Sequence, residues 1–329
     1  MGDFERRVLR LVSEGKLSPE DGDELLRAHQ VGTVRDIRAT LEGTFADVGR
    51  YVRERTEPDE RELLREDLPA GEGPLELDVE GDFALTLQPG DPGVCRAVWR
   101  SARPVLGEPQ SPPDVHLEGR RLRVQGRERY GFGIAFWPFS LDVYVPEGTP
   151  LAGAIVQRWG RARIDGLPVE QLRIDQQNGR VQLDAPEVDD LIVASRNGSI
   201  EVAARQGRKL RVSAYNGRVS LRGALQDVEA TTRNGGVEAD LRPAADASCN
   251  LQTLNGSVEL QIAPDIACTL SAETVHGAIL ANLPGMEVHE DSREFGRRVL
   301  RGRTEGEAGA LTAHLSTTNG TVRISRGPR

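Results

Sequence analysis

The stretch Leu191-Ile-Val-Ala-Ser-Arg-Asn-Gly-Ser-Ile-Glu-Val202 holds two short apolar runs joined by Asn197-Gly198. Counted from the asparagine, apolar residues stand at positions −6, −4, +3 and +5. The same positions are apolar around Asn178 and Asn216 and, with a cysteine at −6, around Asn255. Alternation of apolar and polar residues with a period of two is typical of a strand with one buried face. Each unit is therefore predicted to be two short strands connected through Asn-Gly.

This unit recurs through the C-terminal half of the chain. The Asn-Gly pair returns at steps of 19, 19, 18 and 21 residues, His276-Gly277 follows after another 21, and a gap of 43 precedes the last pair. A constant period of this size indicates stacked repeats. A tight hairpin is the other common use of Asn-Gly, but one such unit is too small to bury its own apolar face. We therefore predict an all-β main domain, a right-handed parallel β-helix (solenoid) with coils of ~20 residues.

The corner residues of such a stack should form a hydrogen-bonded column. Asparagine amides of successive coils bond to one another in stacked in-register β structures, and glycine adopts corner conformations that other residues resist. From Asn197 onward, the residue two positions before each corner asparagine or histidine is small or hydroxylated, which suits a crowded inner corner. The predicted internal ladder consists of Asn178, Asn197, Asn216, Asn234, Asn255, His276 and Asn319.

The N-terminal part has a helical pattern instead. Residues 1–30 are predicted to form a helical hairpin, broken at Glu14-Gly15-Lys16, whose second helix is capped by Ser18. An apolar stripe in residues 33–56 predicts one amphipathic helix, which either packs on the β region or self-associates. The predicted domains are the hairpin at 1–30, the amphipathic helix and a charged linker at 31–66, and the β-helix at 67–329, with an irregular part at 67–150, regular coils at 151–283, an insertion at 284–309 and a last coil at 310–326 that closes the stack.

An aromatic segment, Tyr130-Gly-Phe-Gly-Ile-Ala-Phe-Trp-Pro-Phe139, interrupts the irregular part. It holds three of the seven phenylalanines and one of the three tryptophans of the chain. One interpretation is core or an end cap of the solenoid. The alternative is an exposed interaction patch made of Phe132, Phe136, Trp137 and Phe139.

Composition excludes several classes of protein. The net charge is −9 and no Lys/Arg block occurs, which argues against nucleic acid as a partner. No run of 18 apolar residues and no apolar signal region is present, so we expect a cytoplasmic protein without a transmembrane segment. Cys95, Cys249 and Cys268 lack the spacing of a metal site and are expected to be reduced, partly buried thiols, with Cys249 and Cys268 near each other. No cofactor or metal is predicted.

Catalysis has to be weighed, because parallel β-helices include polysaccharide lyases and hydrolases. Glu238 and Glu259 stand at position +4 of neighbouring units and would be stacked, where they could hold a cation or raise each other's pKa. No constellation of Asp, Lys and Arg accompanies them. The sequence therefore favours a protein that is not an enzyme, with a carbohydrate-active enzyme as the alternative.

Arginines flank the Asn-Gly corners or the equivalent Trp159-Gly160. If stacked, they would form a cationic ridge suited to anionic polymers or lipid headgroups, and hence to peripheral membrane contact. The plainer interpretation is that corners are exposed and arginine is the common polar residue of this chain. The possible ridge consists of Arg158, Arg161, Arg180, Arg196, Arg218 and Arg233.

Two motifs carry a family resemblance. Val145-Pro-Glu-Gly-Thr149 leads into repeats that end in Asn-Gly-Ser/Arg-Val/Ile, and residues 70–326 thereby resemble a bacterial family of β-strand-repeat proteins labelled putative adhesins. Residues 12–26 are similar to the short helical hairpin that precedes such repeats in some cell-envelope stress proteins. The resemblance implies a role in membrane-stress responses. We therefore expect a non-catalytic scaffold that docks on a protein partner or self-associates through its N-terminal helices.

Overall fold

The structure, a computed structural model, describes residues 59–69, 73–101, 111–126, 139–243, 246–294, 296–306 and 309–327. The chain divides into two units, and the larger, Glu60–Arg100 with Ser111–Arg329, contains nearly all of these residues. Every regular element among them is a β-strand. The predicted helices at 1–30 and 33–56 lie outside the described residues, as do Phe132, Phe136 and Trp137.

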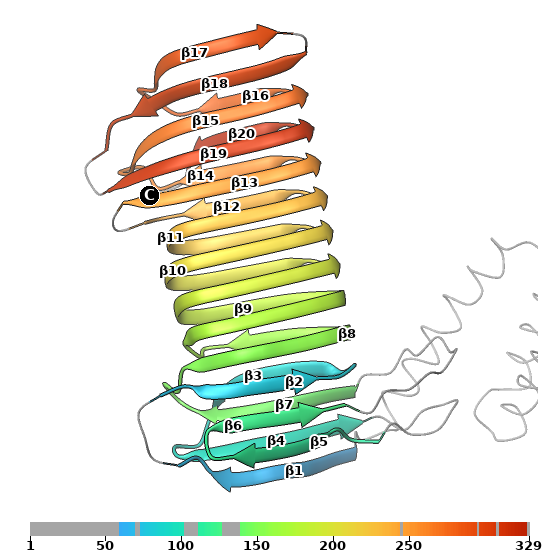
Figure 1. The fold of residues 1–329 in the computed structure, drawn as a ribbon. Helices are drawn as coiled ribbons and strands as arrows, with labels where there is room; N and C mark the ends of the chain where they lie inside the picture. The colour runs from blue at the N-terminus through green and yellow to red at the C-terminus, as the bar shows by residue number, and fades with distance from the viewer. Residues whose placement is uncertain are drawn as a thin grey trace, which may run out of the picture. The chain divides into compact units, whose positions relative to one another are not determined.

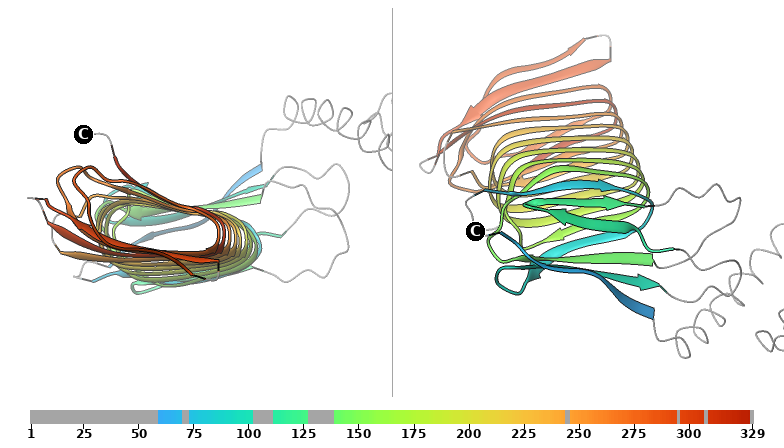
Figure 2. Two further views of the ribbon diagram at one scale, coloured as in Figure 1. Left: turned by 90° about the horizontal axis from the view of Figure 1, so that it is seen from above. Right: turned by 60° about the horizontal axis from the view of Figure 1, so that its bottom comes forward.

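The regular part of the larger unit is a stack of coils in which each backbone pairs with the coil before it and the coil after it (Figure 1). Its strands are β8 (Leu151–Asp165), β9 (Val169–Asn197), β10 (Ile200–Asn216), β11 (Val219–Asn234), β12 (Val237–Leu241), β13 (Ala247–Asn255) and β14 (Val258–Ile262). The pairings are parallel, and their register joins equivalent repeat positions, such as Asn197 with Asn216 and Asn216 with Asn234. Seen from its end, the stack shows coils nested as flattened loops (Figure 2). The main domain is therefore an all-β solenoid, as predicted.

One continuous apolar core runs through these coils. In β10, Leu210 and Val212 are buried whereas Arg211 and Ser213 are exposed, which is the predicted alternation. The residues at position −4 of successive coils stack on one another and are each no more than 2% exposed: Ile155, Ile174, Val193, Val212, Ala230 and Leu251. Burying one large aliphatic side chain contributes about 1.5–3 kcal/mol. A single coil cannot gain this alone, because only its neighbours cover its inward face.

The preceding strands extend the N-terminal end of the stack less regularly. They are β1 (Asp59–Asp67), β2 (Leu75–Glu80), β3 (Ala84–Gly90), β4 (Val94–Ser101), β5 (Asp114–Glu118), β6 (Arg121–Gln125) and β7 (Phe139–Pro146). β2 lies in parallel between β6 and β8, and β3 pairs in parallel with β7 and β8. β5 pairs with β6 in the antiparallel direction, and β1 joins β7 through β4.

The first of these strands departs from the sequence-based prediction. Residues 57–66 were assigned to a charged linker, but β1 begins at Asp59. Two glutamates of β1 accept hydrogen bonds from arginines of β4. Arg96 Nε donates to Glu62 at 2.7 Å, and Arg100 Nε donates to Glu60 at 2.6 Å. Leu64 is only 6% exposed. A strand whose outward carboxylates pair with a neighbouring strand has the same composition as a solvated linker, which is why composition alone misled.

The C-terminal strands do not stack in the order of the sequence. They are β15 (Ala267–His276), β16 (Ile279–Asn282), β17 (Glu287–Glu294), β18 (Arg297–Thr304), β19 (Ala310–Asn319) and β20 (Val322–Arg326). β19 pairs in parallel with β13 on one side and β15 on the other, and β20 lies likewise between β14 and β16 (Figure 1). The prediction that residues 310–326 close the stack is therefore wrong. The chain skips one coil position after β14 and returns at its C-terminal end to fill it.

Charged strands lie at both ends of the stack. β17 and β18 form an antiparallel hairpin in the predicted insertion, and β18 pairs with β15. Across this hairpin Arg298 pairs with Asp291 at 3.3 Å, Arg301 with Glu290 at 2.9 Å and Arg303 with Glu287 at 2.8 Å. β1, with the sequence DERELLRED, is equally charged. Charged edge strands discourage pairing with further sheets, so neither β17 nor β1 favours end-to-end growth.

Candidate functional site: the asparagine corner

The asparagine side chains form a hydrogen-bonded column along one edge of the solenoid. From Asn197 onward, Nδ2 of each asparagine donates to Oδ1 of the asparagine in the neighbouring coil at 2.7–2.9 Å, whereas Asn178 donates to the carbonyl of Arg158. The column consists of Asn178, Asn197, Asn216, Asn234, Asn255 and Asn319. His276 lies in register with Asn319, but no hydrogen bond joins these two side chains. The predicted ladder is thus present, without His276 as a hydrogen-bonded member.

This column lies on the outside of the coil rather than inside it. Asn197, Asn216, Asn234 and Asn255 are exposed, so the prediction of an internal ladder is wrong. Positions −6, −4 and −2 face inward on the strand, and straight alternation would also place position 0 inside. The chain bends at Asn-Gly, which turns the asparagine outward and leaves position −2 as the last inward residue.

A second row of hydrogen bonds runs inside the same corner, at position −2. Thr253 Oγ1 donates to the carbonyl of Gly235 at 2.9 Å, and Thr317 Oγ1 donates to that of Gly256 at 2.9 Å. Thr274 makes the same contact with Gly320 at 3.1 Å. These threonines are buried, so each hydroxyl needs such a partner. The small or hydroxylated residues seen in the sequence therefore form the inner half of the corner.

The glycines are required because neighbouring coils approach closely at the corner. A Cβ on Gly217 would lie 1.8 Å from the carbonyl oxygen of Gly198, and one on Gly320 would lie 1.8 Å from that of Gly256. Neither Gly217 nor Gly320 has a positive φ. The conformational role that the sequence suggested holds at Gly179, Gly198, Gly235 and Gly256, which have a positive φ. Close approach of two backbones is the reason that these positions share.

The six arginines of the proposed ridge fall into two rows on opposite sides of the asparagine column. Arg161 pairs in register with Arg180 at position +2, and Arg218 continues that row. Arg158, Arg196 and Arg233 stand at position −1. A single ridge is therefore not formed.

Most of the +2 row is bound to carboxylates. Arg180 donates to Ser199 at 3.0 Å and lies 3.9 Å from Glu201, and Arg218 lies 3.4 Å from Glu238. In the −1 row, Arg158 pairs with Asp82 at 3.3 Å. Arg233 lies over the ring of Tyr215, 5.0 Å from its centroid. Within the described ranges, Arg161, Arg196 and Arg233 have no carboxylate within ion-pair distance.

The two stacked glutamates are each held by an arginine. Glu238 and Glu259 are register partners, as the sequence predicted. Glu238 binds Arg218, and Glu259 accepts a hydrogen bond from Arg323 at 3.0 Å. Arg323 comes from the inserted C-terminal coil, which the sequence could not place beside Glu259. This arrangement resembles a row of surface ion pairs more than an acid and base poised for proton transfer.

Phe139 is the one residue of the predicted aromatic patch that the structure describes. Its ring stacks on Trp99 with centroids 5.9 Å apart, and Trp99 in turn meets the edge of Phe83 at 6.1 Å. Trp99 and Phe83 are buried in the core. Phe139 therefore belongs to the core packing of the N-terminal strands, which was the first of the two interpretations.

All three cysteines are buried free thiols. Burial raises the pKa of Cys95 and of Cys268 to about 11, and it raises the pKa of Cys249 still further. β19 lies between the strands of Cys249 and Cys268. The two cysteines were expected in neighbouring coils, but one coil separates them.

Among the described residues, no group of three or more His, Cys, Asp or Glu side chains is arranged to hold a metal ion.

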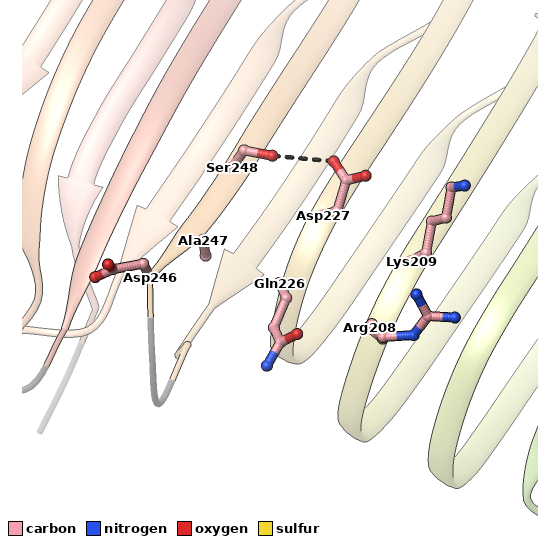
Figure 3. A pocket seen from close by; sticks show the side chains of 7 residues that line it. All are labelled: Arg208, Lys209, Gln226, Asp227, Asp246, Ala247 and Ser248. Atoms are coloured by element: carbon pink, nitrogen blue, oxygen red, sulfur yellow. Dashed lines mark hydrogen bonds between the residues drawn. The ribbon is translucent and has the colours of Figure 1, made fainter.

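A shallow recess lies beside the start of β13, next to residues of β10 and β11 (Figure 3). It has a volume of about 450 Å³ and is lined by Arg208, Lys209, Gln226, Asp227, Asp246, Ala247 and Ser248. Ser248 Oγ donates to Asp227 at 3.0 Å, and Arg208 is bound by Asp189. The Arg208 guanidinium holds the pKa of Asp189 below its usual value. Lys209 and Asp246 have no ion-pair partner among the described residues, and this mixture of charges points to no single class of ligand.

Comparison with known proteins shows the family of this chain. The family model described as Toastrack DUF4097 matches residues 111–294, more than half of the chain. The chain belongs to the Toastrack family. A second model, described as a SHOCT-like domain, matches residues 3–32 of this Toastrack protein. No curated protein matches this chain.

Three solved structures are distantly similar to this Toastrack chain. A putative cell adhesion protein from Clostridium sporogenes is 10% identical, with 82% of this chain and 100% of that chain covered and a TM-score of 0.31. A putative adhesin from Bacteroides fragilis is 10% identical, with 82% and 97% covered and a TM-score of 0.38. A putative lipid binding protein from Parabacteroides distasonis is 11% identical, with 83% and 97% covered and a TM-score of 0.36. Likenesses of this degree say nothing about the ligand of this Toastrack chain.

In the part that the structure describes, no helix is long and apolar enough to cross a membrane.

Proposed function

We propose that this protein is a non-catalytic interaction scaffold, in which a rigid Toastrack solenoid carries an N-terminal docking module. The observation that carries the proposal is the uninterrupted ladder from Asn178 to Asn319 beside rows of paired surface charges. Such a surface is an ordered array with fixed spacing, which suits binding of an extended partner. The proposal includes the right-handed coil and the cytoplasmic location expected from the sequence.

The docking module in this proposal is the N-terminal segment. The SHOCT-like match at residues 3–32 supports a separate unit there. Two short helices cannot bury their apolar faces alone, so we propose that residues 1–58 self-associate or dock on a protein partner. Both ends of the stack carry charged strands, which makes the N-terminal segment a better candidate for self-association than the sheet edges.

Light scattering coupled to size exclusion tests self-association. The full chain is expected to form a defined oligomer, and a variant lacking residues 1–56 is expected to be a monomer. The deletion stops before β1, because removal of residues 59–66 would also remove a strand that pairs with β4. Monomers in both samples would rule out self-association through this segment.

The resemblance to cell-envelope stress proteins extends this proposal to a role in envelope-stress signalling. Deletion of the gene is expected to change survival under membrane-active or cell-wall-active compounds. Complementation with the variant lacking residues 1–56 should fail if the docking module transmits the signal. Unchanged survival of the deletion strain would count against the signalling role.

A carbohydrate-active enzyme is the alternative function. Its one support is the register pairing of Glu238 with Glu259, and the arginines bound to both carboxylates weaken that support. A screen against anionic polysaccharides tests it, with Glu238→Gln and Glu259→Gln as controls. Turnover that both substitutions abolish would establish the alternative, and no turnover on any substrate would remove it.

A further inference from the structure

One line along the asparagine corner gathers exposed apolar and cationic side chains. Among the described residues, Trp159 is 64% exposed, Tyr215 45% and Leu254 40%, and all three stand at position 0 or −1 of their coils. Arg196 and Arg233 occupy position −1 of the coils on either side of Tyr215. We call Trp159, Arg196, Tyr215, Arg233 and Leu254 the corner strip.

The coil register sets the geometry of the corner strip. Trp159 is in register with Asn178, and Tyr215, Arg233 and Leu254 precede ladder asparagines of successive coils. At about 4.8 Å per coil the strip is on the order of 20–25 Å long. Arg233 stacks on Tyr215 with 5.0 Å between the guanidinium carbon and the ring centroid. The strip therefore has a regular spacing along one corner, and the contact between Arg233 and Tyr215 orders two of its side chains.

No residue of the strip is acidic, although the whole protein has a net charge of −9. Asp82 lies at the Trp159 end, where its carboxylate accepts from the backbone N–H of Trp159 and pairs with Arg158. Positions −1 and 0 of the coils from Trp159 to Asn319 contain no Asp or Glu. Arg196 and Arg233 have no carboxylate partner among the described residues. From Asn197 onward, each ladder amide has two N–H groups and donates one to its neighbour, so the second N–H remains a donor at this exposed edge. The corner strip thus attracts anions on an otherwise acidic molecule.

We propose that the corner strip docks on the surface of an anionic lipid bilayer. Tryptophan and tyrosine favour the boundary between headgroups and acyl chains, where one end of the side chain is apolar and the other is wet. Arginines beside them are attracted by anionic headgroups. Leu254 is exposed in water and would be buried among acyl chains, whereas a soluble polyanion gives it no favourable contact. The strip follows an outer corner, so it has the shape of an edge laid on a surface, unlike the concave site that small ligands need.

Vesicle co-sedimentation with the full chain tests this proposal. Wild-type protein is expected to bind vesicles of phosphatidylcholine with phosphatidylglycerol and not vesicles of phosphatidylcholine alone, and salt should weaken the binding. Arg196→Gln with Arg233→Gln is expected to lower the partition coefficient roughly tenfold or more. Trp159→Ser with Leu254→Ser should lower it by a similar factor, because insertion of the apolar side chains is lost.

Two control variants match these changes in chemistry but lie away from the strip. Arg173→Gln with Arg303→Gln removes the same charge from exposed arginines. Leu280→Ser with Val288→Ser removes side chains that are 52% and 53% exposed. Both control variants should bind as the wild type does. Equal losses in controls and strip variants, or no binding to anionic vesicles, would overturn the proposal.

A parallel titration with a soluble anionic polysaccharide tests whether the strip binds an anionic polymer instead of a membrane. Binding that depends on the strip arginines but not on Trp159 or Leu254, and that is absent on vesicles, would also overturn the membrane assignment. The proposal does not require self-association, since residues 1–56 contribute nothing to the strip. Failure of the light-scattering test and failure of the vesicle test are therefore distinguishable.

Discussion

Oδ1 of Asn255 accepts a hydrogen bond from Nδ2 of Asn319 at 2.7 Å, although 64 residues separate the two in the chain. The next corner residue in sequence after Asn255 is His276, and it lies one coil further away, beside Asn319. This contact marks the place where the C-terminal coil is inserted into the stack. The coil is paired on both sides, which gives its side chains a large effect on stability.

Leu315→Ala should therefore destabilise the protein as a central core substitution would. Leu315 is 2% exposed and lies between Leu251 and Ala272 of the two flanking coils. The expected loss is about 2–5 kcal/mol in the free energy of unfolding. Chemical denaturation measures it, and His314→Ala, an exposed position of the same strand, is the control that should change little. A loss near zero for Leu315→Ala would mean that the coil is not held in this slot.

Gly217→Ala is expected to be strongly destabilising because of contact between backbones. The added Cβ would lie 1.8 Å from the carbonyl oxygen of Gly198, so two coils would have to separate. We expect a loss of roughly 3 kcal/mol, at the upper end of the range for overpacked sites. Gly236→Ala is the matched control, since the nearest atom to its added Cβ is 3.4 Å away. Similar melting temperatures for the two variants would contradict the close-approach explanation.

Asn216→Ala removes two ladder hydrogen bonds, one donated to Asn197 and one accepted from Asn234. The side chain is exposed, so water replaces part of the loss. Each such bond contributes about 1 kcal/mol net, and we expect a loss of about 1–2 kcal/mol in thermal or chemical denaturation. Asn282→Ala, at an exposed asparagine outside the ladder, should be close to neutral. The ladder would have no energetic role if both variants unfolded at the wild-type midpoint.

The buried thiols predict a dependence of reactivity and stability on alkaline pH. The pKa of Cys95 and of Cys268 is raised from 9.0 to about 11 by burial, so the folded state keeps both protons where the unfolded state releases them. Their contribution to stability is present below pH 9 and is lost as the pH rises from 9 through about 11. At pH 8 a thiol reagent should label none of the three cysteines in the native protein and all three in denaturant. Rapid labelling of the native protein would show that the core opens locally.

The repeat period could be read from the sequence because the apolar positions around Asn178, Asn197 and Asn216 are set by pairing between successive coils. The order of the last coils could not be read from the sequence. Thr317 and Asn319 have the same offsets as Thr253 and Asn255, and these offsets fit any slot in the stack. The 43-residue gap is equally compatible with a coil at the end and with one inserted earlier.

The candidate site was predicted less completely than the fold. The arginines were recognised, but positions −1 and +2 lie on different sides of a bend that alternation does not reveal. The same bend turns the ladder outward. The contribution of Trp159, Tyr215 and Leu254 depends on their exposure, and a strand pattern cannot tell an exposed corner residue from one that a neighbouring loop covers.

The inserted coil has a consequence for synthesis of the protein. The ribosome delivers the coils from the N-terminal end, and each of the earlier ones can pair with its predecessor as it emerges. The slot beside β13 and β14 stays open until the last strands, β19 and β20, have left the exit tunnel. A chain that terminates early keeps two unpaired strand edges and an uncovered core, and quality-control proteases recognise such features. Synthesis of the chain through β20 is thus a condition for closing this part of the solenoid.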